Sequence, residues 1–199
     1  MKIVLENIHK SYGKRNIVNN VSLSVAQGEV VGLLGPNGAG KTVTFYTATG
    51  LTKPDRGKIW LDDEDITSLS IHHRARLGIG YLAQEPSIFR NLSVVDNILL
   101  VMEQTKVPRK LWSQKIHELI SEFSLEKVAY SLGNQLSGGE RRRAELARSL
   151  ASGVNGPKFL FLDEPFAGVD PIAVEEIQSI VARLKNKNIG ILITDHNVD

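Results

Sequence analysis

The sequence predicts an α/β fold in which helices cover a mostly parallel β-sheet. Two observations support this prediction: short apolar segments alternate with segments of helical periodicity, and polar side chains come directly after several apolar segments. Alternating strands and helices favour parallel strands joined by right-handed crossovers. Ligands of such sheets bind beyond the carboxyl ends of the strands, so we expect these polar residues to share one site.

The first fifty residues predict three strands and a helix. Residues 3–8 alternate loosely between apolar and polar side chains, and residues 21–25 alternate cleanly, as a half-buried strand does. Residues 29–34 are rich in Val and Leu, which is typical of a buried parallel strand. Residues 43–49 predict a helix that ends at Gly50, which is suited to a C-terminal cap.

The middle of the chain changes from alternating strands and helices to helices alone. A strand, a helix and a second strand precede the change, over residues 58–61, 70–77 and 79–82. Beyond residue 85, Ser93 and Asp96 match a helix cap, and residues 111–123, with Trp112 packed among them, have an apolar helical face. We interpret the section from 85 to about 133 as a helical insertion.

The last third of the chain returns to alternating strands and helices. Residues 158–162 and 189–194 are hydrophobic and predict strands. Between them, Asp170 can cap and Pro171 can begin a helix with an apolar face.

A glycine-rich loop between the predicted strand 29–34 and the predicted helix 43–49 fits the Walker A pattern, G-x-x-x-x-G-K-[ST]. Its glycines allow several backbone N–H groups to point at one anion, and the helix adds the positive end of its dipole. The lysine supplies a full charge to terminal phosphates, and the threonine hydroxyl can ligate Mg²⁺. The eight loop residues are Gly35, Pro36, Asn37, Gly38, Ala39, Gly40, Lys41 and Thr42.

Polar residues also follow three other predicted strands. Asp163 ends an apolar strand, the Walker B arrangement, where a carboxylate can hold Mg²⁺ directly or through water. Glu164 precedes Pro165, which favours an extended backbone, so we expect its side chain to point away from that of Asp163 and to act on water as a general base. Gln84 is placed to reach the metal or the attacking water, and His196 to donate to a γ-phosphate.

A second glycine-rich motif, residues 136–140, begins another predicted helix. Its serine and glutamate match a capping box, and the N–H groups of the helix start make a second anion site. The residues of this site are Ser137, Gly138, Gly139 and Glu140. We interpret the arginines at 141–143 as a solvated helix face or a subunit contact, rather than a nucleic-acid patch.

Composition and charge exclude several classes of protein. The chain has 199 residues, of which 42% are hydrophobic, and its net charge of +2 is too small to indicate nucleic-acid binding by itself. The absence of cysteine excludes disulfides, thiolate metal sites and cysteine nucleophiles. No apolar run approaches the roughly 20 residues that span a bilayer, so at a membrane we expect another chain to do the spanning.

In combination, these motifs resemble those of the ATP-binding subunits of ABC transporters, and the resemblance covers the whole chain. Besides Walker A, the matching residues are Gln84 of the Q-loop, the signature 136–140, Walker B at 159–163 with Glu164 after it, the D-loop 167–170, His196 of the H-loop, and Tyr12 as the aromatic that stacks on the base. The resemblance implies a P-loop NTPase fold of the RecA-like type, with an antiparallel β subdomain and an inserted helical subdomain. It implies one domain over residues 1–199, in which 1–84 and 156–199 form the core and 85–155 the helical subdomain.

The resemblance also implies how such a chain works. The signature of one subunit closes over the nucleotide held by the Walker motifs of another, which gives a head-to-tail homodimer with two ATP molecules. The metal ligands would be Thr42, Gln84 and Asp163, and Glu164, His196 and Gln84 would serve catalysis. Integral-membrane permease subunits would contact a groove near Phe89 and Arg90, with no nucleic acid as a partner.

Within the family, four segments are similar to the ATPases of lipopolysaccharide export: residues 74–82, 87–90, 163–174 and 193–198. This likeness implies a peripheral protein on the cytoplasmic face of the bacterial inner membrane. ATPases of branched-chain amino-acid importers are less similar. A soluble relative that acts on DNA or ribosomes, and a small-molecule kinase, remain alternatives. Because the family usually continues well past the H-loop histidine, we expect a chain ending at Asp199 to be a fragment.

Overall fold

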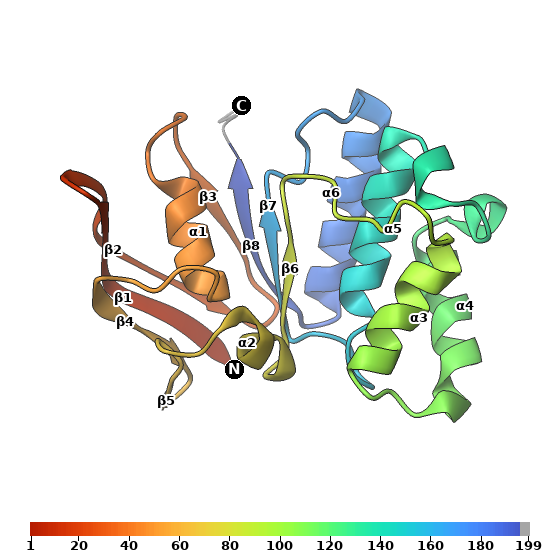
Figure 1. Ribbon diagram of the computed structural model, residues 1–199, viewed down its shortest axis with the longest axis horizontal. Helices are drawn as coiled ribbons and strands as arrows, with labels where there is room; N and C mark the ends of the chain where they lie inside the picture. The colour runs from red at the N-terminus through yellow and green to blue at the C-terminus, as the bar shows by residue number, and fades with distance from the viewer. Residues whose placement is uncertain (196–199) are drawn as a thin grey trace.

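The structure, a computed structural model, describes residues 1–195, and its elements follow the predicted order of strands and helices (Figure 1). Its strands are β1 (Lys2–Tyr12), β2 (Arg15–Ala26), β3 (Val30–Leu34), β4 (Arg56–Leu61), β5 (Glu64–Asp65), β6 (Ile79–Leu82), β7 (Phe159–Asp163) and β8 (Gly190–Asp195). Its α-helices are α1 (Lys41–Thr49), α2 (Ile71–Arg76), α3 (Val94–Gln104), α4 (Trp112–Glu122), α5 (Gly138–Leu150) and α6 (Pro171–Asn186). Within residues 1–195, every helix is too short or too polar to serve as a membrane span.

The strands form two sheets that lie on either side of helix α1 (Figure 1). One sheet is parallel, in the order β3-β8-β7-β6, and the other is antiparallel, in the order β2-β1-β4-β5. Phe45 of α1 lies in an apolar cluster with Ile3 of β1 and Phe161 of β7, so the helix ties the two sheets together. The predicted fold class, a mostly parallel core with an antiparallel part and added helices, is confirmed.

Strands β1 and β2 are longer than predicted because an irregularity interrupts their alternation. They pair as an antiparallel hairpin, and the register shifts between Leu5 and Ile8. Asn7, inside this stretch, has a φ of 51°, in the left-handed region. An extra residue of this kind moves the side chains that follow it to the other face of the sheet, so a strict period of two is lost.

The strand before the glycine loop is parallel, as predicted, but the prediction that it is buried is wrong. Among the described strands β3 pairs with β8 alone, so it forms an edge of the sheet. Val30 and Leu34 at its ends are 39% and 52% exposed. A composition rich in Val and Leu indicates that a strand packs against something, but it does not say whether neighbours cover both sides.

Helix α1 forms although β-branched residues dominate it, because their hydroxyl groups find partners inside the helix. Thr47 donates to the Val43 carbonyl at 2.7 Å, and Thr49 donates to the Tyr46 carbonyl at 3.1 Å. Both threonines are buried, so these bonds replace bonds to water. Gly50, with a φ of 83°, ends the helix as predicted.

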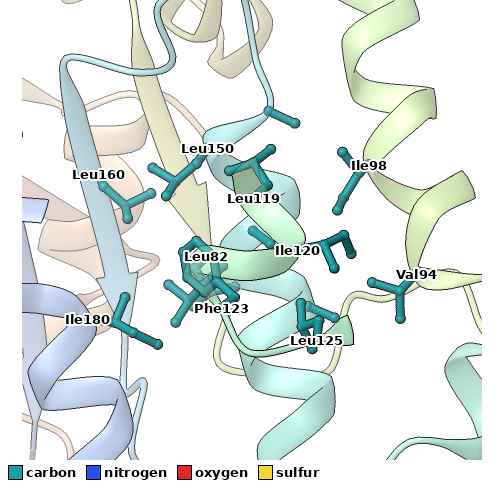
Figure 2. Close-up of a cluster of buried hydrophobic side chains, with 14 of the residues drawn as sticks. Leu82, Val94, Ile98, Leu119, Ile120, Phe123, Leu125, Leu150, Leu160 and Ile180 are labelled. Atoms are coloured by element: carbon teal, nitrogen blue, oxygen red, sulfur yellow. The ribbon is translucent and has the colours of Figure 1, made fainter. Parts of the chain in front are cut away.

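Helices α5 and α6 cover the face of the parallel sheet opposite α1, and α3 and α4 lie outside them (Figure 1). Figure 2 shows the apolar cluster that joins these layers, with Leu160 of β7, Leu150 of α5, Ile180 of α6, Leu119 of α4 and Ile98 of α3. The helical section predicted after residue 85 is therefore anchored to the sheet through α5.

Three predicted helix caps are present. Ser93, Ser137 and Asp170 each accept a hydrogen bond from the backbone N–H three residues later, at 3.0, 3.3 and 3.0 Å. Pro171 occupies the first position of α6. These side chains satisfy N–H groups that have no partner inside a helix, which is why local sequence locates the three helix starts.

Candidate nucleotide-binding and hydrolytic site

The carboxyl ends of the parallel strands meet at one edge of the core sheet, at the top of Figure 1. The register aligns Leu34 with Asp195 and Asp163 with Thr194, so β3, β8 and β7 end side by side, and β6 ends next to β7. The segments that follow β3, β6 and β7 therefore leave from one edge, as predicted. His196, which follows β8, lies outside the described residues.

The glycine loop adopts a backbone that only glycine tolerates well. Gly38 and Gly40 have φ values of 83° and 88°. At Gly40 the loop also approaches β2 closely, because a Cβ added there would lie 2.6 Å from the Ile17 carbonyl oxygen. A tight turn then feeds directly into α1, which places the N–H groups of the helix start at the loop.

Two side chains at the start of α1 are those predicted to contact phosphate and metal. Lys41 is 7% exposed, and its Nζ donates to the carbonyls of Gly35 and, at 3.1 Å, of Pro36. The lysine side chain thus lies over the loop, and its ammonium group is held by carbonyls at the start of the loop. Thr42 lies beside it in the first turn of α1, half-buried.

Asp163 is a buried carboxylate with one oxygen unsatisfied. The side chain is 1% exposed, and Oδ1 accepts a hydrogen bond of 2.6 Å from the Thr194 hydroxyl. Oδ2 is buried and has no hydrogen-bond partner among the described residues. Burial raises the pKa of Asp163, and the nearby carboxylate of Glu164 raises it further, whereas Thr194, Arg142 and Lys41 act in the opposite direction.

This unsatisfied oxygen fits a magnesium ion. Mg²⁺ takes one or two protein oxygens and completes its shell with water and phosphate oxygens, so a single buried carboxylate and a hydroxyl are a suitable donor set. The described residues contain no group of three or more His, Asp and Glu side chains that would form an all-protein metal site. The donors present therefore fit a metal that arrives with a nucleotide.

Glu164 and Gln84 meet across the strand ends. Gln84 Nε2 donates to Glu164 Oε2 at 2.8 Å. The predicted extended backbone at Glu164 is wrong, because its φ is 43°, in the left-handed region. Its N–H donates to the Thr194 hydroxyl at 2.9 Å and its carbonyl accepts from Ala167 at 3.1 Å, and these bonds outweigh the preference that Pro165 imposes.

The second predicted anion site is a well-formed helix cap. The Ser137 N–H donates to Glu140 Oε2 at 2.8 Å, and the Glu140 N–H donates back to the serine hydroxyl. Hydrogen bonds from the backbone N–H and from the side chain of Ser137 lower the pKa of the Glu140 carboxylate, which favours its ionised form. Gly138 faces open space, whereas a Cβ on Gly139 would lie 2.9 Å from Ala173 of α6. The cap is thus exposed on one side and packed on the other.

Of the three arginines after this cap, Arg142 does not lie on a solvated helix face, which was one of the two roles that we predicted for them, whereas Arg141 and Arg143 are partly exposed. Arg142 is 6% exposed and points under the strand ends, where it donates to the carbonyls of Ala83, Asp163, Glu164 and Pro165. The prediction failed because a run of three arginines was treated as one unit. The sequence signal that was overlooked is the glutamate at position 145, three residues later and on the same side of the helix.

The residues predicted to contact the base and the membrane partner are exposed. Tyr12 is 53% exposed, with the Lys10 ammonium 5.5 Å from its ring centroid. Phe89 is 49% exposed and lies 5.4 Å from the Arg148 guanidinium, and Arg90 beside it is exposed. A separate groove of about 820 Å³ between α4 and the end of α6 shares no residue with this site.

Comparison with known proteins gives the class of protein that this site defines. The model of the family "ABC transporter" matches residues 18–167, which include the glycine loop, the capped helix α5 and the Asp163–Glu164 turn. The chain therefore belongs to the ABC transporter family.

The similar curated proteins include two that export lipopolysaccharide. The chain is 54% identical to the lipopolysaccharide export system ATP-binding protein LptB of Haemophilus influenzae, and 52% identical to LptB of Escherichia coli K12. Both alignments cover 98% of this chain and 80% of the relative. Among solved structures, the ADP conformation of MJ1267, an ATP-binding cassette of an ABC transporter, is 29% identical with a TM-score of 0.88, and the alignment covers 100% of this chain and 83% of that one.

Proposed function

We propose that this chain is the ATP-hydrolysing subunit of an ABC export complex that moves lipopolysaccharide out of the bacterial inner membrane. The observation that carries the hydrolytic part is the set of groups at the strand ends, where an unsatisfied buried carboxylate lies next to a glutamate that pairs with a glutamine. The identity of more than half of all positions to LptB from Haemophilus influenzae, over nearly the whole chain, supports the cargo.

The loop binds the phosphates and the neighbouring carboxylates prepare the attack of water. The backbone N–H groups of residues 37–40 and the Lys41 ammonium bind the β- and γ-phosphates, whose oxygens replace the loop carbonyls as partners of the lysine. Magnesium, held by Thr42 and Asp163 with Gln84 near, would neutralise charge on those phosphates. Glu164 accepts a proton from the attacking water, a role worth about 10²–10⁴ in rate.

The remaining predicted site residues complete the site around the nucleotide. Tyr12, exposed at the end of β1, stacks on the base, and His196 donates to the γ-phosphate. The exposed Ser137–Glu140 cap of a second copy covers the triphosphate. Two copies of the chain then hold two ATP molecules head to tail. The cassette MJ0796, which is 26% identical to this chain, has been solved as a dimer.

The membrane partner would dock on the helical side of the molecule. Phe89 and Arg90 are exposed next to α5, where an apolar and a charged contact are available to a helix of a permease subunit. In this arrangement the chain works as a peripheral subunit on the cytoplasmic face of the inner membrane, and it needs no nucleic acid.

The test combines turnover with partner identity. The chain should release phosphate from ATP only with Mg²⁺, and Lys41→Ala should lose nucleotide binding and turnover. Purified from membranes of its host, the tagged chain should carry along permease subunits that bind lipopolysaccharide. Recovery of a permease for another cargo would refute the lipopolysaccharide assignment, and absence of turnover in the wild-type chain would refute the hydrolytic one.

A further inference from the structure

A buried ion pair in the middle of α5 is not used by the proposed reaction. Arg142 and Glu145 are 6% and 2% exposed, and their side chains meet at 3.2 Å. Buried charges are rare unless they are paired and hydrogen-bonded. The hydrogen-bond partners of Arg142 and of Glu145 therefore show which segments each side chain holds in place.

Glu145 holds the segment that carries Gln84. Its Oε1 accepts the backbone N–H groups of Ser87 at 2.6 Å and Ile88 at 3.1 Å, while Oε2 faces Arg142. One turn further along α5, Arg148 donates to the Ser87 carbonyl at 2.7 Å and to its hydroxyl at 2.6 Å. The backbone after β6 is therefore fixed to α5 by charged groups.

Arg142 holds the turn that carries Glu164. Its guanidinium donates to the carbonyls of Asp163, Glu164 and Pro165 at 3.2–3.4 Å, and to that of Ala83 at 2.8 Å. The side chains carried by these two segments, Gln84 and Glu164, are hydrogen-bonded to each other at 2.8 Å. The hydrogen bonds thus form a closed ring: Gln84 bonds to Glu164, the Glu164 carbonyl to Arg142, Arg142 to Glu145, and Glu145 to the segment that follows Gln84.

The same helix begins at the signature cap. Ser137 is eight positions before Glu145, which in an α-helix is about 12 Å along the axis. Because Gly139 packs closely on α6 and the helix is continuous from 138 to 150, a shift of the cap moves the ion pair with it. In the proposed dimer, this cap touches the nucleotide held by the other copy.

We propose that Glu145, acting through Arg142, is a positioning residue that holds Gln84 in contact with Glu164, and that the position of α5 controls this contact. A nucleotide bound at the cap of one copy would then control hydrolysis in that copy's own site. This inference rests on the proposed function. It predicts positive cooperativity between the two ATP molecules and assigns it to one buried pair.

The test measures turnover against ATP concentration for the wild-type chain and three variants. Glu145→Ala leaves two N–H groups and a guanidinium without their acceptor, and it should lower kcat by about 10²-fold, the cost typical of a misplacement of about 1 Å. Its affinity for ATP should stay within twofold, and its Hill coefficient should fall to 1. Glu145→Gln keeps an oxygen for Ser87 and Ile88 and should retain most of kcat. Leu150→Ala, in the apolar cluster at the far end of α5, is the matched control for lost stability.

The outcomes separate positioning from folding. Leu150→Ala should melt earlier yet keep the wild-type kcat per folded molecule and the wild-type Hill coefficient. If Glu145→Ala does not fold, Arg142→Lys, which keeps the charge but loses the fork of donors, should show the same loss of kcat and cooperativity. A wild-type kcat and Hill coefficient in Glu145→Ala or in Arg142→Lys would overturn the inference while leaving the ATPase function intact. A wild-type enzyme without cooperativity would overturn it as well. A wild-type chain without turnover would instead refute the proposed function.

Discussion

At the scale of single residues, the molecule tolerates a buried carboxylate that costs stability. Asp163 is fully enclosed, yet only one of its oxygens has a hydrogen-bond partner among the described residues. Burial raises its pKa, so folding disfavours the ionised form relative to the unfolded chain. The resulting stabilisation is complete at low pH and is lost as the pH rises through the raised pKa, so the ionised group destabilises the fold at neutral pH.

Asp163→Asn should therefore stabilise the protein and abolish its function. Without nucleotide at pH 7.5, we expect a rise in Tm of about 2–4 °C, which corresponds to about 1 kcal/mol in a domain of this size. The gain should shrink as the pH is lowered through the raised pKa of Asp163, because the wild-type aspartate is then neutral as well. Mg²⁺-dependent turnover should fall by at least about 10²-fold. Calorimetry at several pH values measures the change in Tm, and an assay of phosphate release measures the loss of turnover. A variant that melts below the wild type at every pH would contradict this account.

At the scale of secondary-structure elements, α1 is fixed at its C-terminal end by a buried arginine. Arg74 of α2 is 1% exposed and donates to the carbonyls of Thr47 at 2.8 Å and Ala48 at 2.7 Å, as well as to those of residues 66, 67 and 69. A cation at a helix C-terminus complements the helix dipole and satisfies its last carbonyls. Burial lowers the pKa of Arg74 to about 10, so it stays charged at neutral pH.

Arg74→Met should lower the free energy of unfolding by about 3 kcal/mol, because several buried carbonyls lose a charged donor at once. ATP affinity should fall as well, since α1 carries the phosphate loop. The matched control is Arg76→Met, two positions later in α2, where the side chain is exposed and the change should stay within about 0.5 kcal/mol. Urea unfolding of both variants decides the matter, and equal stability of the two would disprove the role of Arg74.

At the scale of the whole molecule, the glycine loop and the signature cap are at the starts of different helices. The side chains of Ser137 and Glu140 each accept a hydrogen bond from the other residue's backbone N–H. A Cβ added at Gly138 would have no atom within 4 Å among residues 1–195. An exposed helix N-terminus with an unobstructed glycine is available to a phosphate brought by a second copy. Assembly is therefore the step that would complete the site.

Glu164→Gln should convert the chain from monomer to dimer when ATP and Mg²⁺ are added, because nucleotide binds but is not hydrolysed. Sedimentation velocity measures the change. Adding Gly138→Leu to this variant should leave Tm unchanged and prevent the dimer. A Cβ at position 138 has no atom of the described residues within 4 Å, and the leucine would occupy the face offered to the partner. Gly139 is unsuitable for this purpose because its Cβ would strike Ala173. A dimer that survives Gly138→Leu would place the interface elsewhere.

The sequence by itself determined the local features of this protein. Ser93, Ser137 and Asp170 bond to backbone N–H groups three residues away, so a short stretch of sequence is enough to predict where these helices start. The glycine loop and the polar residues after the apolar strands are equally local. The α/β order of elements then placed those residues at one sheet edge, because parallel strands bring their carboxyl ends together.

Only the tertiary structure decided which groups are covered and which distant groups meet. The exposure of β3 depends on having β8 alone as a neighbour, and the backbone of Glu164 depends on Thr194, thirty residues later. The long-range partners of the Arg142–Glu145 pair, the carbonyl of Ala83 and the N–H of Ser87, depend on the packing of α5 under the strand ends. Burial and long-range hydrogen bonds arise from packing between segments far apart in the chain, and no local pattern of residues encodes them.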